Sequence, residues 1–98
     1  MGTMLIKQRV LDIDRWAKWF YEPQLDAARR EYGLTAVGSF VDADHDDTVI
    51  VLLEAETEEA ARRYVNSQTL AGVRERCGAI GFPDGVWLGI SPIVNPYA

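Results

Sequence analysis

Five apolar residues follow one another from Val49 to Leu53, and this run is the strongest constraint on the fold. It lies within a strand predicted over Thr48–Ala55. Because successive side chains of a strand point to opposite faces, this strand is apolar on both faces. Both faces of the sheet that contains it therefore need a cover.

Turn and capping residues divide the rest of the chain into alternating strands and helices. Pro23 is predicted to interrupt the first helix, and Gly33 to end it with left-handed backbone. The predicted strands are Met4–Leu11, Leu34–Val41, Thr48–Ala55 and Val86–Val94, with a polar hairpin loop at Asp42–Asp47 and Pro92 at an edge or bulge position. The predicted helices run from a cap at Asp12 or Asp14 to Tyr32, from a cap at Thr57 to about Asn66, and from a cap at Ser67 or Thr69 to about Gly78.

This order of elements, β-α-β-β-α-β, predicts the split βαβ or ferredoxin-like arrangement, an α+β fold with an antiparallel sheet. A chain of 98 residues has the length of one domain, 1–98. The helices cover one face of the sheet, and the simplest cover for the other face is the same face of a second copy. Two sheets packed in this way form a dimeric α+β barrel.

The composition excludes several classes of partner. The formal net charge is −5, whereas nucleic acids and anionic membranes select a basic surface. No apolar run approaches the roughly 18 residues of a membrane span, and no secretion signal is visible. Cys77 is the only cysteine, so an intrachain disulfide is impossible and a cytoplasmic location is expected.

Three segments resemble small dimeric α+β barrel proteins, and together they extend over nearly the whole chain. Residues 10–20 are similar to the opening "V-x-D-(Y/F)-x-x-W-x-x-x-F" of those proteins, and Gly33 matches the glycine after their first helix. The acidic hairpin at 41–51 is also similar. Residues 67–70 and 77–83 resemble their segment "S-x-x-L … A-G-V-x-G-x-P".

The resemblance implies a fold and a range of activities. The superfamily includes antibiotic-biosynthesis monooxygenases, haem-degrading enzymes, muconolactone isomerase-like proteins and polyketide cyclases. Its members bind ligands between the sheet and the helices. This sequence has no clear match to a haem-ligating histidine on a helix, so no cofactor is expected.

Aromatic residues are the first candidates for such a ligand site. Trp16, Trp19 and Phe20 form one helical stripe together with Ala27. Two interpretations remain open, a packed core alone or a core that also lines a pocket. In the second, Trp87 and Tyr64 complete an aromatic wall, with the Tyr64 hydroxyl as a donor to a ligand oxygen. Ser39 leaves room in the second strand for a large ring.

The polar sequence Lys7-Gln8-Arg9 lies in a strand that is expected to be buried. Buried polar groups need a hydrogen-bond partner, which a pocket or a second subunit can supply. If Gln8 faces the helices, it is a polar anchor in the pocket, and Arg9 lies at the dimer interface, paired with Glu54 or Asp42. In the opposite register Arg9 enters the pocket, where it suits a carboxylate or enolate.

The remaining candidates favour structural roles. His45 lies in an acidic loop, but the spacing does not fit a calcium hand and no second histidine or cysteine is near for zinc, so no metal is expected. Cys77 is interpreted as a small buried residue. The pairs Arg29-Arg30 and Arg62-Arg63 are interpreted as solvated helix faces.

The functional expectation is a homodimer that binds a hydrophobic, oxygenated, polyketide-like metabolite. It is either a cofactor-free cyclase, isomerase or monooxygenase, or a ligand-binding or stress-related protein without turnover, or a purely structural dimer. No catalytic residue is assigned. The expected pocket residues are Gln8, Arg9, Trp16, Trp19, Phe20, Ser39, Tyr64 and Trp87.

Overall fold

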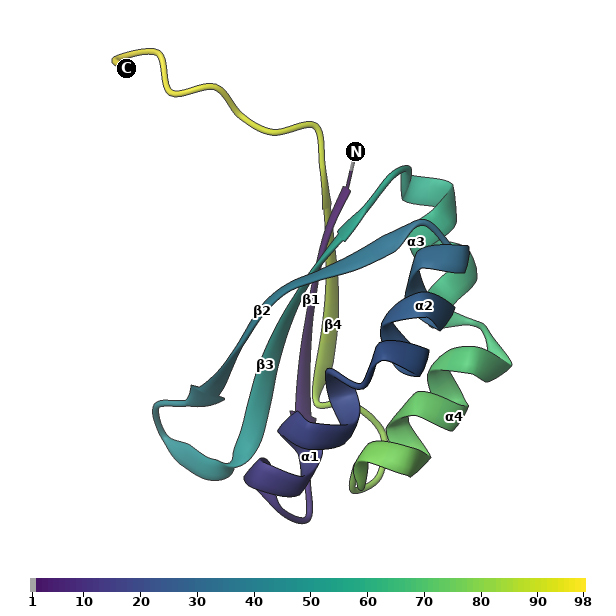
Figure 1. Ribbon diagram of the computed structural model, residues 1–98. Coiled ribbons are helices and arrows are strands. Elements are labelled where there is room, and N and C mark those ends of the chain that lie inside the picture. Colours follow the sequence, from purple (N-terminus) through teal and green to yellow (C-terminus); the bar gives the residue numbers. More distant parts are fainter. Residues whose placement is uncertain (1) are drawn as a thin grey trace.

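The computed structural model describes residues 2–98. Four antiparallel strands form one sheet in the order β2-β3-β1-β4 (Figure 1). The strands are β1 (Gly2–Arg9), β2 (Leu34–Asp42), β3 (His45–Ala55) and β4 (Gly85–Ile90). The helices are α1 (Ile13–Phe20), α2 (Pro23–Glu31), α3 (Glu58–Val65) and α4 (Gln68–Cys77). The predicted α+β, ferredoxin-like order is confirmed, with each of its two helices divided into two pieces.

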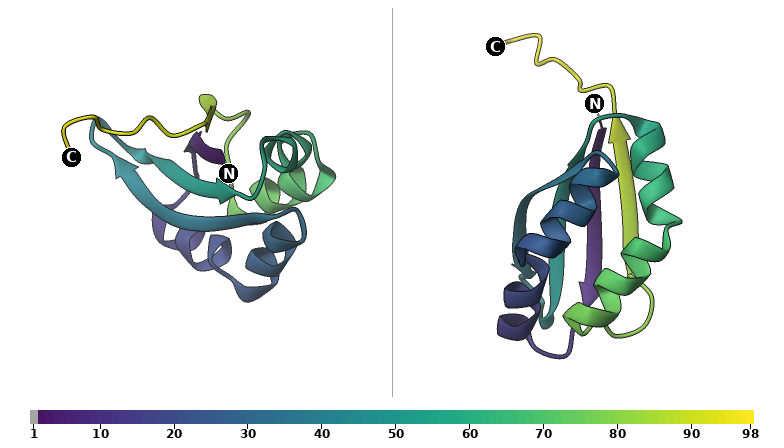
Figure 2. Two further views of the ribbon diagram at one scale, coloured as in Figure 1. Left: turned by 90° about the horizontal axis from the view of Figure 1, so that it is seen from above. Right: turned by 45° about the vertical axis from the view of Figure 1, so that its right-hand side comes forward.

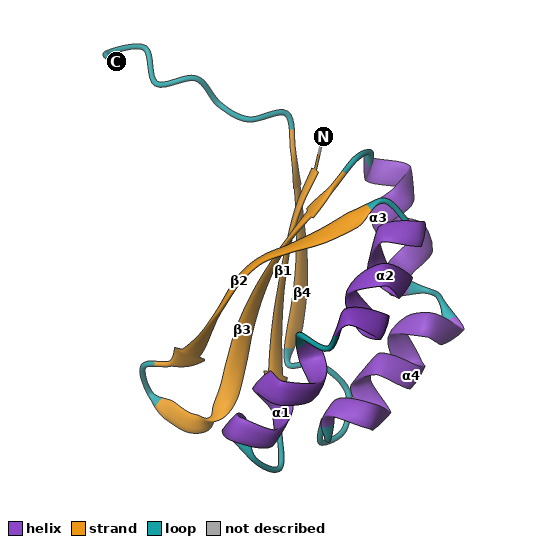
Figure 3. Cartoon of the chain, viewed as in Figure 1, coloured by secondary structure: helices purple, strands orange, loops and turns teal. Residues whose placement is uncertain are grey.

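The four helices lie on one face of the sheet and leave its other face without a helical cover (Figures 1 and 3). A view from a second direction shows the pair α1 and α2 beside the pair α3 and α4 in front of the strands, with α4 next to α1 (Figure 2). The chain therefore has two layers, and it has one apolar interior, between the sheet and the helices.

Side-chain caps and turns fix the ends of the first helical pair. The Asp12 carboxylate accepts a hydrogen bond from the Arg15 amide at 2.8 Å and starts α1. Pro23 occupies the first turn of α2, where its missing N–H is harmless, so the predicted interruption is confirmed. Gly33 follows α2 with φ 81°, the left-handed backbone that glycine adopts most readily.

The second helical pair is bounded by the same kind of cap. The Thr57 hydroxyl accepts from the Ala60 amide at 3.0 Å, and the Ser67 hydroxyl accepts from the Leu70 amide at 3.1 Å. Of the two caps considered for α4, Ser67 is therefore the one used. Gly78 ends α4 with φ 77°.

Several strand boundaries differ from the prediction. The hairpin loop is shorter than 42–47, because the Asp42 carboxylate accepts from the Asp44 amide at 2.9 Å and tightens the turn, so β3 begins at His45. β1 ends at Arg9 rather than two residues later. β4 ends at Ile90 rather than Val94, because Ser91 has φ 55° and turns the chain away from the sheet.

The interior is built on alternate residues of the central strands. Met4 and Ile6 of β1 and Val51 and Leu53 of β3 are buried against the helices. Trp16 of α1 stacks on Phe20, with ring centroids 4.6 Å apart. The predicted helical stripe is wrong at Ala27, which is exposed, because the restart at Pro23 gives α2 its own helical phase.

The uncovered side of the sheet carries a band of apolar side chains, here called the open face. The register pairs Phe40 with Ile50, Leu52 with Leu5, and Leu5 with Trp87, so the band crosses all four strands. Phe40 is 61% exposed and Trp87 is 54% exposed. As the sequence predicts, β3 is apolar on both faces, and only one of them is covered within the chain.

Candidate functional site

A cavity of about 50 Å³ lies between the sheet and the helices. Its wall is almost entirely apolar, and Ala79 and Pro83 of the connection between α4 and β4 complete it. Four of the expected pocket residues line it, namely Gln8, Trp16, Phe20 and Tyr64. The other lining residues are Ile6, Val51, Leu53, Leu70, Val73, Cys77 and Val86, together with one charged residue, Arg74.

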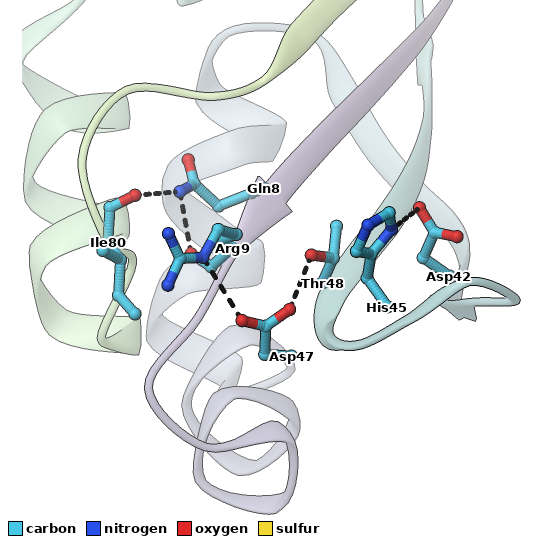
Figure 4. A network of polar contacts seen from close by, with 7 residues as sticks. All are labelled: Gln8, Arg9, Asp42, His45, Asp47, Thr48 and Ile80. Carbon is cyan, nitrogen blue, oxygen red and sulfur yellow. Dashed lines mark hydrogen bonds and ion pairs between the residues drawn. The ribbon is translucent and has the colours of Figure 1, made fainter.

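Gln8 faces the helices, and its amide is fully engaged. Its Nε2 donates to the carbonyls of Arg9 at 2.8 Å and Ile80 at 3.0 Å (Figure 4). Its Oε1 accepts from Arg74 Nε at 3.2 Å. Arg74 Nη2 also contacts the Gly81 carbonyl. Gln8 therefore ties the connection after α4 to the central strand, which satisfies its own buried polar atoms.

Arg9 lies on the opposite side of β1, outside the cavity. Its Nε is 3.2 Å from Asp47 Oδ2, so its partner is neither of the two acids considered from the sequence (Figure 4). Asp42 instead pairs with Lys7, at 2.9 Å. The hydrogen bond from Lys7 is the main reason that the pKa of Asp42 is lowered. These ion pairs border the open face of the sheet.

Trp87 also lies on the open face rather than in the cavity. Its ring extends over Gly85, where an added Cβ would overlap the ring. Only a residue without a side chain leaves room for this ring position, so Gly85 and Trp87 form one surface feature. Leu5 of β1 and Trp87 of β4 are paired across the two strands, so their side chains lie on the same face of the sheet.

Trp19 and Ser39 are the other expected pocket residues that do not line the cavity. Trp19 is partly buried beside Arg76, whose guanidinium carbon is 4.6 Å from the ring centroid. Arg76 in turn pairs with Glu22 at 3.0 Å. The Ser39 hydroxyl lies 2.5 Å from the Tyr21 hydroxyl near the edge of the sheet. Trp19 therefore packs α1 against α4, and Ser39 links β2 to the end of α1.

Two titratable side chains in the cavity wall are held neutral. Burial raises the pKa of Tyr64 to about 12 and that of Cys77 to about 11. Both groups are therefore protonated at neutral pH. Among residues 2–98, no cluster of three or more histidine, cysteine or acidic residues is arranged to hold a metal ion.

Arg29, which the sequence placed on a solvated helix face, is completely buried. Its Nη2 donates to the Phe20 carbonyl at 2.7 Å, and its guanidinium lies 4.2 Å from the centre of the Phe20 ring. The prediction was wrong because it gave Arg29 the same environment as its neighbour Arg30, which is exposed. In the helix that begins at Pro23, Arg29 lies on the same face as Leu25, Ala28 and Tyr32, and this face points inward.

Comparison with solved structures gives close matches of fold. The structural genomics protein YJCS has a TM-score of 0.59 and 11% identity, over 93% of this chain and 98% of its own. A candidate antibiotic biosynthesis monooxygenase from Nitrosomonas europaea has a TM-score of 0.58 and 12% identity, over 93% and 98%. An antibiotic biosynthesis monooxygenase has a TM-score of 0.57 and 11% identity, over 95% and 100%.

This chain has the ferredoxin-like fold of the antibiotic biosynthesis monooxygenase-like proteins. The ferredoxin-like α+β fold expected from the sequence is therefore confirmed, and the dimeric barrel stays a prediction. No family model matches the sequence, and no curated protein is significantly similar to it. At 11–12% identity the likeness concerns the fold, and the site has to be argued from this chain's own residues. Within residues 2–98, no helix has the length and apolar character needed to cross a membrane.

Proposed function

We propose that this protein binds a hydrophobic, oxygenated small molecule in the cavity between its sheet and helices. The observation that carries the proposal is the apolar wall around Trp16 and Phe20, which includes very few polar groups and one hydroxyl, that of Tyr64. Ligand sites in proteins typically combine such walls with a small number of placed donors. The polyketide-like metabolites expected from the sequence belong to this class of ligand.

The preferred activity is that of a cofactor-free monooxygenase, cyclase or isomerase. Two structures with this fold carry the name antibiotic biosynthesis monooxygenase, which supports an enzymatic role. In such an enzyme the Trp16 and Phe20 rings provide shape and exclude water, and the Tyr64 hydroxyl orients a ligand oxygen.

A binding protein without turnover is the second candidate. It is favoured by the raised pKa values of Tyr64 and Cys77, which leave both side chains neutral at pH 7. Neither group is then a ready base or nucleophile. Incubating the protein with its recovered ligand separates the two candidates, because only an enzyme converts that ligand.

The size of the cavity bears on how a ligand enters. A closed apolar cavity of roughly 150 Å³ holds benzene, whereas this one measures about 50 Å³. It therefore accepts a group of a few heavy atoms as it stands. We propose that a larger ligand displaces the connection between α4 and β4, which Gln8 holds through the Ile80 carbonyl.

We further propose that the single domain forms a homodimer through the open face. Phe40, Leu5 and Trp87 present a continuous apolar band that no helix within residues 2–98 covers. Bands of this kind mark interaction surfaces, and a twofold axis allows the same band to cover itself. Two open faces packed together would complete the dimeric α+β barrel expected from the sequence.

The binding proposal is tested by filling the cavity. Val73→Phe adds a ring to a buried wall residue of α4, whereas Val65→Phe adds the same ring at a position that is 38% exposed. Each protein is purified from its native host and extracted with organic solvent, and the extract is analysed by mass spectrometry. Wild type and Val65→Phe should release a compound that Val73→Phe lacks. Identical extracts from all three would refute the cavity as the binding site.

A further inference from the structure

Arg29 is a buried cation without a counter-charge. It is 0% exposed, and no carboxylate within residues 2–98 forms an ion pair with it. One of its nitrogens is bonded to the Phe20 carbonyl, but Nε and Nη1 have no acceptor among the described residues. Arginine is almost never fully buried unless it is paired, because an uncompensated charge is unfavourable in a low-dielectric interior.

The guanidinium does not itself line the cavity, but it lies against a residue that does. It stacks on Phe20, and its positive charge acts to lower the pKa of both Tyr64 and Cys77, although burial dominates and raises them. All three of these residues line the cavity. They come from α1, α3 and α4, so Arg29 is placed where three helices converge on the wall.

We propose that the cavity binds its ligand through an anionic oxygen, a carboxylate or an enolate, held beside Tyr64 and balanced by the charge of Arg29. This inference rests on the proposed binding function, since it concerns the same cavity. The Tyr64 hydroxyl donates the hydrogen bond to that oxygen. Arg29 is a positioning residue, which acts by its field through the wall.

The other polar groups of the cavity already have hydrogen-bond partners, and this is why an anionic ligand is preferred. The Gln8 amide is already bonded on both sides, so it offers a ligand little. Arg74 is bonded to Gln8 and to the Gly81 carbonyl. Neither arginine has a carboxylate partner within residues 2–98, but only Arg29 is fully buried with two nitrogens, Nε and Nη1, that have no acceptor there, and a carboxylate is the group that arginine pairs with most strongly.

The test compares two probes of the same shape, isobutyrate and isobutyramide. Each is titrated at neutral pH into the isotopically labelled wild-type protein, and binding is followed by NMR shifts at Trp16 and Tyr64. Isobutyrate should bind at least about tenfold more tightly than the amide, the factor expected for a hydrogen bond to a charged group. This comparison needs no variant and so does not depend on a substitution being tolerated.

Variants then assign the preference to Arg29. Arg29→Met should remove the preference for isobutyrate and leave isobutyramide binding unchanged. Arg30→Met is the matched control, because Arg30 lies on the same helix but is exposed and paired with Asp26 at 2.7 Å. Arg29→Lys keeps the charge and should retain part of the preference.

The outcomes separate this inference from the binding proposal. Equal affinity of the wild-type protein for both probes overturns the anionic ligand but leaves the cavity as a binding site. A preference that survives Arg29→Met overturns the role of Arg29. Absence of binding by either probe at millimolar concentrations counts against the cavity itself, and the inference fails with it.

Discussion

Replacing Phe40 by alanine is expected to weaken the proposed dimer strongly. Phe40 is 61% exposed in the single chain and lies beside Ile50 on the open face. A phenylalanine presents about 200 Å² when fully exposed, so about 120 Å² of each ring is available for burial against a partner.

The magnitude follows from this area. At about 25 cal/mol per Å², two rings contribute at most about 6 kcal/mol to the free energy of association. If the interface covers half of that area, the loss is about 3 kcal/mol. The dissociation constant should then rise by roughly 100-fold, since about 1.4 kcal/mol corresponds to a factor of ten.

Sedimentation equilibrium over a concentration series measures the dissociation constant directly. Leu11→Ala is the matched control: Leu11 is 66% exposed but lies in the connection between β1 and α1, where it contacts Gly78, so its loss should leave the dimer intact. A wild-type protein that stays monomeric, or a Phe40→Ala dimer as tight as wild type, would refute the reasoning.

Two further predictions concern the interior. Trp16→Ala removes a buried ring that stacks on Phe20, so it should lower the free energy of unfolding by about 3–5 kcal/mol in urea titrations. Trp19→Ala removes a partly exposed ring in contact with Arg76, so its loss of stability should be clearly smaller. Equal losses would contradict the assigned packing. The folded pKa of Tyr64, about 12, lies above its ordinary value of 10.0, so its contribution to stability is complete below pH 10 and falls by roughly 3 kcal/mol between pH 10 and 12. Tyr64→Phe should reduce this alkaline loss by that amount in the same titrations, and an unchanged pH profile would show that the Tyr64 phenol is not held neutral.

The sequence predicts the elements well where local chemistry determines them. Asp12, Thr57 and Ser67 start helices because their oxygens bond amides one turn ahead, and this geometry is local. Pro23 and Gly33 act through their own backbone preferences. The apolar run of β3 similarly requires two covered faces, which leads to the proposal of a second subunit.

The ends of strands are predicted less well, because they depend on partners and on turn geometry. The side chain of Asp42 shortens the hairpin, and the φ of Ser91 ends β4 before its apolar pattern ends. Neither effect is visible in hydrophobic periodicity.

The candidate site is predicted in part for a similar reason. Trp16, Phe20 and Tyr64 were expected in the pocket, and their helices bring them together there. Trp87 was assigned to the wrong face, because the residue type alone does not reveal the register of β4. Arg29 was missed because charged residues on helices are usually solvated, and only the helical phase set by Pro23 places it inside.

A crystal structure of the protein purified from its native host tests the central claim most directly, because such a protein retains any tightly bound ligand. The account predicts electron density for a small molecule between the sheet and the helices, in contact with Trp16 and with an oxygen beside Tyr64. A cavity filled by the protein's own side chains, with no density for a bound molecule, would contradict it and leave these aromatic residues with a purely structural role.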